Sequence, residues 1–105
     1  MPVEAVKINL GRVREFSKDM GTKVNLLKLS IAVFHLSDDR FYALHNCCPK
    51  GGELVEGAIL GEHIFCPQHD CKINVKNGVM QAPDSGQIET FHVEVEDSFI
   101  YLTLA

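Results

Sequence analysis

Two short segments, NCCPKGGELVEG at residues 46–57 and CPQHDC at residues 66–71, contain all four cysteines of this chain. They lie in the middle of 105 residues, and the long flanks on either side have no cysteine. Disulfides that stabilise a small secreted domain are usually spread over the fold. Thiols confined to two neighbouring segments indicate instead two loops that close on one metal centre. The alternative is four cysteines without a ligand role.

Short runs of alternating apolar and polar residues surround these loops, which is typical of an all-β protein. Strands are expected at residues 6–10, 23–27, 30–36, 41–44, 58–60, 63–65, 72–75, 89–96 and 99–104, and a short helical turn within residues 12–18. In the closing hairpin, Phe91, Val93 and Val95 alternate with polar residues and predict one buried face. The pattern predicts a β-sandwich or small barrel with one inserted hairpin, whose two ends carry the cysteine loops.

Length and composition exclude several classes of protein. The 105 residues fit one domain, since domains usually have roughly 100–200 residues. The net charge of −4 and the lack of a basic face argue against nucleic-acid binding. The apolar runs are too short to span a bilayer, and residues 1–7 do not resemble a signal peptide, so we expect a cytoplasmic protein. The chain has no glycine-rich phosphate loop.

The second loop offers two metal ligands at close spacing. Cys66 and His69 are near enough in sequence for a tight turn to bring a thiolate and an imidazole to one metal site. Pro67 stiffens this turn. In the first loop, Gly51 and Gly52 allow the backbone to approach a metal centre closely, with amide N–H groups directed at bridging sulfides.

This pair of loops at the two ends of a hairpin resembles the Rieske iron–sulfur domain. That family has Cys-x-His in the first loop and Cys-x-x-His in the second, and binds a [2Fe–2S] cluster with two cysteines on one iron and two histidines on the other. The resemblance extends to residues 31–36, 41–44, 51–54, 65–69 and 76–78 and to Gly57 and Pro83. It implies a single Rieske-like domain over residues 1–105, a β-sandwich with a small hairpin subdomain that carries loop 1 (46–57) and loop 2 (66–71).

Within the family, the length and the closing hairpin are most similar to the small subunit of the NAD(P)H-dependent assimilatory nitrite reductase. This resemblance implies a non-catalytic accessory subunit in nitrate assimilation. Its partner would be the large subunit, which carries FAD, siroheme and a [4Fe–4S] cluster and reduces nitrite to ammonium. A stand-alone Rieske-type ferredoxin that carries electrons is the second hypothesis, and a zinc-binding interaction module is the third.

The first loop departs from the family pattern Cys-Pro-His-Lys/Arg-Gly-Gly. If the loops are aligned on cysteine and proline, a histidine is missing between Pro49 and Lys50. If they are aligned without a gap on the glycines, Cys47 takes the cysteine position and Pro49 the histidine position. Proline has no side-chain ligand atom, so no imidazole stands at the ligand position in either alignment.

The resemblance therefore implies a ligand set that is one member short. Carried over by position, the ligands are Cys48, Cys66 and His69, with Cys47 as the other candidate for the first-loop cysteine. The candidate substitutes for the fourth ligand are His45, Cys71 and the spare vicinal cysteine. Three outcomes stay open: a [2Fe–2S] cluster with a substitute ligand, a Zn²⁺ held by Cys and His, or a vacant site on a protein-binding platform. A vacant, oxidised site would favour a disulfide between Cys66 and a first-loop cysteine.

The other histidines have simpler interpretations. His35, His63 and His92 occupy alternating positions in predicted strands and are expected to pack or to face solvent. Cys66 and His69 could form a nucleophile–base pair, but the only orienting carboxylate nearby in sequence is Asp70. No catalytic residue is therefore expected.

Overall fold

The computed structural model describes residues 6–26, 29–47, 53–66, 72–81 and 86–104. In chain order, the elements of this part are β1 (Val6–Arg12), η1 (Val13–Glu15), β2 (Met20–Leu26), β3 (Leu29–His35), β4 (Phe41–His45), η2 (Leu54–Glu56), β5 (Ala58–Leu60), β6 (His63–Phe65), β7 (Lys72–Asn74), β8 (Thr90–Glu96) and β9 (Phe99–Leu104). The two helices, η1 and η2, are single turns of 3-10 helix. None of the described helices is long and apolar enough to cross a membrane.

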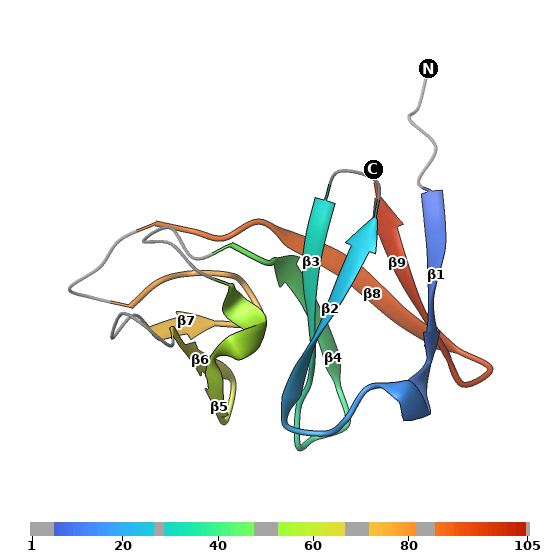
Figure 1. Ribbon diagram of the computed structural model, residues 1–105, viewed down its shortest axis with the longest axis horizontal. Helices are drawn as coiled ribbons and strands as arrows, with labels where there is room; N and C mark the ends of the chain where they lie inside the picture. The colour runs from blue at the N-terminus through green and yellow to red at the C-terminus, as the bar shows by residue number, and fades with distance from the viewer. Residues whose placement is uncertain (1–5, 27–28, 48–52, 67–71, 82–85, 105) are drawn as a thin grey trace.

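The strands form two antiparallel sheets of different size. The large sheet has the order β1-β9-β8-β4-β3-β2, and the small sheet has the order β5-β6-β7. The small sheet is inserted between β4 and β8 in the chain and lies beside β2 and β3, while β1 and β9 lie at the opposite side of the molecule (Figure 1). We call η2 and β5–β7 the loop subdomain. The prediction of an all-β fold is confirmed, and the three-stranded small sheet is consistent with the predicted insertion.

Strands β3 and β4 separate two hydrophobic cores because successive strand residues point to opposite faces. One face of this strand pair belongs to the base core, which lies within the large sheet. The opposite face belongs to the loop-side core, which lies between the large sheet and the loop subdomain. The base core contains Phe16, Ile31, Val33, Ala43, Ile100 and Leu102. The loop-side core contains Ala32, Phe34, Leu36, Leu44, Leu54, Ile64, Cys66, Ile73, Val75, Met80 and Ile88.

A glycine in β2 lets the loop subdomain approach the large sheet. A Cβ added at Gly21 would lie 2.7 Å from the ring of Phe34 and 3.1 Å from the Cα of Val55 in η2. Any side chain at this position would therefore push η2 away from β2 and β3. The hydrogen of Gly21 thus allows the exit of loop 1 to pack against the large sheet.

The observed strands recur at the predicted places, with shifts at their ends. Strand β2 begins at Met20 instead of Lys23. The helical turn expected within residues 12–18 is the three-residue η1. The prediction that Val95 is buried was wrong, because this side chain is 49% exposed. Val95 pairs with the fully buried Ile100 of β9 and lies close to the exposed turn at residues 97–98, so its side chain is left uncovered although its partner is buried.

Candidate metal centre

Loop 1 leaves the large sheet at the end of β4, where Asn46 is buried. Its amide Nδ2 donates a hydrogen bond to Ser30 Oγ at 3.1 Å. Its Oδ1 accepts one from the backbone N–H of Val55 in η2 at 3.0 Å. The side chain of Asn46 therefore joins the start of loop 1 to its end.

Two further contacts fix the end of loop 1. Leu54 is fully buried in the loop-side core. The preceding residue, Glu53, accepts a hydrogen bond from Lys23 Nζ of β2 at 2.6 Å. Both charged side chains of this pair are about two-fifths exposed, at 42% and 39%, so the contribution of the ion pair to stability is small. The burial of Leu54 is therefore the stronger anchor.

Loop 2 begins at Cys66, directly after β6. Cys66 is only 6% exposed and packs in the loop-side core, which also contains Leu54. The beginning of loop 2 and the end of loop 1 are therefore held in one core. Cys66 is disulfide-bonded in this structure.

The structure describes only some of the predicted ligands. Cys47 is exposed, and its backbone N–H donates to the carbonyl of His45 at 2.8 Å. Cys48, His69 and Cys71 lie outside the described residues. In the described ranges, no group of three or more His, Cys, Asp or Glu side chains could hold a metal ion. The predicted ligand set as a whole therefore stays a prediction.

The strand register places His45 on the base side of β4. His45 pairs with Ile31 of β3, and Ile31 belongs to the base core. Ala43, two residues before His45, belongs to the same core. Because residues two apart in a strand point to the same face, His45 faces away from the core that contains Cys66. This geometry argues against His45 as the substitute ligand and favours a thiolate.

Two other histidines have protein partners of their own. His35 is buried; its Nδ1 donates to the carbonyl of Phe16 at 2.9 Å, and its ring stacks on Phe41 with centroids 4.1 Å apart. His63 Nε2 lies 3.2 Å from Gln81 Nε2. Both observations agree with the prediction that these histidines serve packing and surface contacts.

Ion pairs lower the pKa of surface carboxyl groups at both sheets, among them Glu62 and Glu94. In the loop subdomain, the hydrogen bond from Lys76 holds the pKa of Glu62 below its usual value. In the large sheet, the hydrogen bond from Lys7 does the same for Glu94. All four side chains lie at the surface, so these pairs describe a solvated exterior and not a catalytic site.

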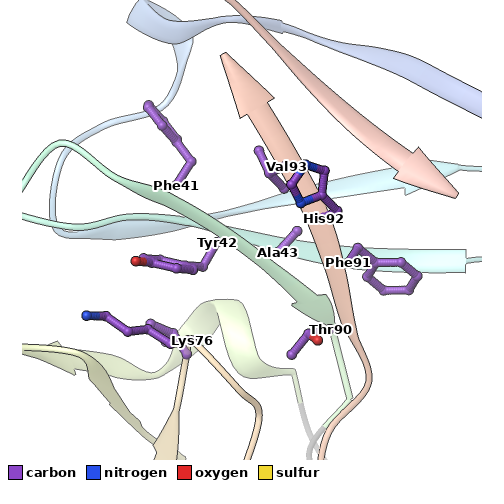
Figure 2. A pocket seen from close by; sticks show the side chains of 9 residues that line it. Phe41, Tyr42, Ala43, Lys76, Thr90, Phe91, His92 and Val93 are labelled. Atoms are coloured by element: carbon purple, nitrogen blue, oxygen red, sulfur yellow. The ribbon is translucent and has the colours of Figure 1, made fainter.

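A groove of about 430 Å³ opens where β4 and β8 diverge. Figure 2 shows Tyr42 and Lys76 extending toward the same side of it. The charges along its wall already have partners: Lys76 Nζ lies 3.1 Å from Glu62 Oε2, and His92 Nε2 lies 3.0 Å from Glu94 Oε1. The described lining provides aromatic and aliphatic surface but no set of metal ligands.

One residue of the site was missed from sequence. Asn46 was treated only as the start of loop 1, although it is a polar residue two positions after Leu44, on the side of the strand that the apolar residues predict to be buried. Its partners, Ser30 and Val55, are distant in sequence, and only the fold brings them together.

The fold, together with the anchored end of loop 1 and the anchored beginning of loop 2, defines a small β domain. Its cysteines lie on paired loops beside the loop-side core. The family model of the Rieske [2Fe-2S] domain matches residues 6–92, and the chain therefore belongs to this family. This confirms the resemblance seen in the loops.

The relatives in this family include ferredoxins. The chain is 34% identical over 74 residues to ferredoxin CarAc of Metapseudomonas resinovorans, which covers 69% of this chain and 68% of that protein. It is 29% identical over 90 residues to the anthranilate 1,2-dioxygenase ferredoxin subunit of Burkholderia cepacia, with 84% and 82% covered. A Mycobacterium tuberculosis protein assigned as an NADH-dependent nitrite reductase small subunit has a similar fold, with a TM-score of 0.88, 16% identity and 98% of both chains covered.

Proposed function

We propose that this chain is an electron-transfer protein of the ferredoxin type, with a [2Fe–2S] cluster held by loops 1 and 2. The observation that carries the proposal is the position of Cys66, which starts loop 2 from inside the core that also anchors the end of loop 1. The identity to two ferredoxins supports the same function. The cluster, when bound, would supply a site that accepts and donates one electron.

The donor set fits a [2Fe–2S] cluster in number but not in the usual Rieske composition. The chain offers four cysteines and His69 in the two loops, whereas a Rieske centre needs two cysteines and two histidines. Since His45 lies on the base side of β4, we propose that thiolates and His69 alone make up the ligand set. Cys66, Cys48 or Cys47, and Cys71 would supply these thiolates. The disulfide at Cys66 must be reduced before it can bind iron.

The chain's own residues set the surroundings of the centre. Burial of Cys66 excludes water from its side of the site, and low solvent exposure is one of the factors that tune the potential of such clusters. Leu54 and Asn46 hold the two ends of loop 1 in place. The electron partner is proposed to be a larger oxidoreductase, since the described residues that line the groove between β4 and β8 include no set of metal ligands.

The nitrite reductase small subunit is the second candidate function. It is supported by the similarity of the whole fold to the Mycobacterium tuberculosis protein, which at 16% identity is a similarity of fold alone. In this case the partner would be the large subunit that carries FAD, siroheme and a [4Fe–4S] cluster. The zinc-module hypothesis has no specific support in the structure.

Purification without air, followed by two assays, would test the proposal. A ferredoxin is expected to be red-brown, to contain iron and sulfide, and to be reduced and reoxidised reversibly at an electrode. Addition of the purified large nitrite reductase subunit separates the two candidates. Stimulation of nitrite reduction by this chain would favour the second function, and reversible electron transfer without such stimulation would favour the first.

A further inference from the structure

We infer that Asn46 is a positioning residue that holds loop 1 in the shape needed to bind the cluster. The inference rests on the proposed function, because it concerns how the first-loop cysteine is presented. Asn46 is 95% buried, since only 5% of its surface is exposed. A buried amide is costly unless its polar atoms have hydrogen-bond partners. The hydrogen bonds of the Asn46 amide therefore fix the position of this side chain.

The amide group of Asn46 links three segments of the chain. Its Nδ2 donates to Ser30 Oγ at the start of β3, and its backbone N–H donates to the carbonyl of Ser30 at 2.9 Å. Its Oδ1 accepts from the backbone N–H of Val55, nine residues further along the chain. The side chain thus closes residues 47–54 into a loop with both ends fixed to β3 and η2.

The position of Asn46 relative to the expected ligands explains its importance. It directly precedes Cys47 and Cys48, and its partner Val55 directly follows Leu54, which is buried in the same core as Cys66. A shift of Val55 relative to Asn46 would change the distance between the first-loop thiols and Cys66. Partners that orient ligands in this way typically change metal affinity by about 10- to 100-fold when they are removed.

The sequence alternation supports this role. Asn46 and Leu44 are two residues apart, and Leu44 belongs to the loop-side core. The side chain of Asn46 therefore continues the loop-facing side of β4, whereas that of His45 continues the base side. The chain places its hydrogen-bonding residue, and not its histidine, on the side where the two loops meet.

The test compares Asn46→Ala with a matched control, Asn77→Ala. The Oδ1 of Asn77 also accepts a hydrogen bond from a backbone N–H, that of Val79 at 2.9 Å, but it lies in the turn after β7. Each variant is reconstituted with iron and sulfide under reducing conditions, at a temperature where all proteins are folded. The rate at which a chelator removes iron, the electron paramagnetic resonance spectrum of the reduced protein and the hydrogen-exchange rate of the Val55 amide are then measured.

We expect Asn46→Ala to lose iron about 10- to 100-fold faster than the wild type, with an altered resonance spectrum and faster exchange at Val55. Asn77→Ala should retain the wild-type values of all three. Equal iron retention and equal spectra in Asn46→Ala and the wild type would overturn the inference and leave the proposed function intact. A folded, reduced wild type that binds no iron and sulfide would overturn the proposed function, and the positioning role with it. The Val55 exchange rate would then show separately whether Asn46 closes the loop.

Discussion

The large sheet and the loop subdomain differ in how they are stabilised. The strands of the large sheet that flank the base core, such as β3 (Leu29–His35) and β9 (Phe99–Leu104), are six or seven residues long and pair over most of their length. The strands β5, β6 and β7 have three residues each. Independent stability requires several strands with a hydrophobic face, and three strands of three residues each offer only a small one. The loop subdomain therefore depends on packing against the large sheet, whereas no buried member of the base core comes from the loop subdomain.

The two cores also differ in chemistry. The buried members of the base core are apolar, and the buried imidazole of His35 lies beside them, stacked on Phe41 and hydrogen-bonded to the carbonyl of Phe16. The loop-side core includes the thiol-bearing residue Cys66, and the buried amide of Asn46 lies at its edge. The fold thus separates the base core from a region in which a buried thiol-bearing residue and a buried amide lie at the ends of two loops.

Restoring the missing histidine should have the largest effect, namely on the spectrum and the reduction potential of the cluster, and this effect should be confined to the loop region. Insertion of one His between Pro49 and Lys50 recreates the family pattern Cys-Pro-His-Lys-Gly-Gly. Two imidazoles on one iron raise the potential from about −400 mV, typical of all-cysteine plant-type clusters, into the Rieske range of about −150 to +300 mV. We expect the reconstituted insertion variant to have a Rieske spectrum and a higher potential than the unmodified chain. Addition of His69→Ala should abolish this spectrum.

An equally strong Rieske spectrum in the unmodified chain would contradict this prediction. It would mean that a second imidazole already binds, despite the position of His45 on the base side of β4.

Truncation of one fully buried isoleucine in each core should separate stability from iron retention. Ile64→Ala in the loop-side core and Ile100→Ala in the base core should each lower the free energy of unfolding by about 2–5 kcal/mol. Only Ile64→Ala should also speed hydrogen exchange in β5–β7 beyond that in β9 and accelerate iron loss. Chemical denaturation, exchange and chelator assays measure these effects, and identical exchange patterns in both variants would show that the division is wrong.

Two glycines with left-handed backbone should differ in their tolerance of a side chain. Gly61 has φ +62° and open space around a built Cβ, so Gly61→Ala should cost about 1–2 kcal/mol. Gly78 has φ +73°, and a Cβ there would lie 2.1 Å from the carbonyl oxygen of Ile88. Gly78→Ala should therefore cost about 2–5 kcal/mol, because overpacking adds to the backbone cost. Similar melting temperatures for the two variants would argue that the segment before β8 is loosely packed.

Removal of a surface ion pair should have the smallest effect on the stability of the protein. The hydrogen bond from Lys76 lowers the pKa of Glu62 below its usual 4.5. Its stabilising contribution is therefore present above pH 4.5 and is lost as the pH falls through the lowered pKa of the folded state. In Lys76→Met, the pKa of Glu62 measured by nuclear magnetic resonance should rise toward its usual value, while that of Glu94, which pairs with Lys7, should stay unchanged. A parallel change at Glu94 would show that the two regions are electrostatically coupled.

The strands could be predicted from sequence because they depend on local patterns. The apolar run of residues 31–34 marked β3, and alternation of apolar and polar residues marked the β8–β9 hairpin. The prediction failed at Val95, since its exposure depends on which segments cover this end of the sheet and not on alternation.

The geometry of the site could not be predicted because it depends on contacts between distant segments. The face on which His45 lies follows from its pairing with Ile31, and the role of Asn46 follows from its bonds to Ser30 and Val55. A sequence pattern gives the spacing of ligands along each loop. It does not give the register that decides which neighbouring side chain faces the other loop.

Iron and acid-labile sulfide analysis of protein purified without air, compared with Cys66→Ser, tests the central claim most directly. Serine keeps the size of the buried cysteine side chain but is a far poorer ligand for iron, and circular dichroism would confirm that both proteins are folded. The account predicts about two iron and two sulfide per wild-type chain, as a [2Fe–2S] cluster requires, and a large loss of both in the variant. A folded wild type without iron and sulfide, or a Cys66→Ser variant that retains them in full, would contradict it.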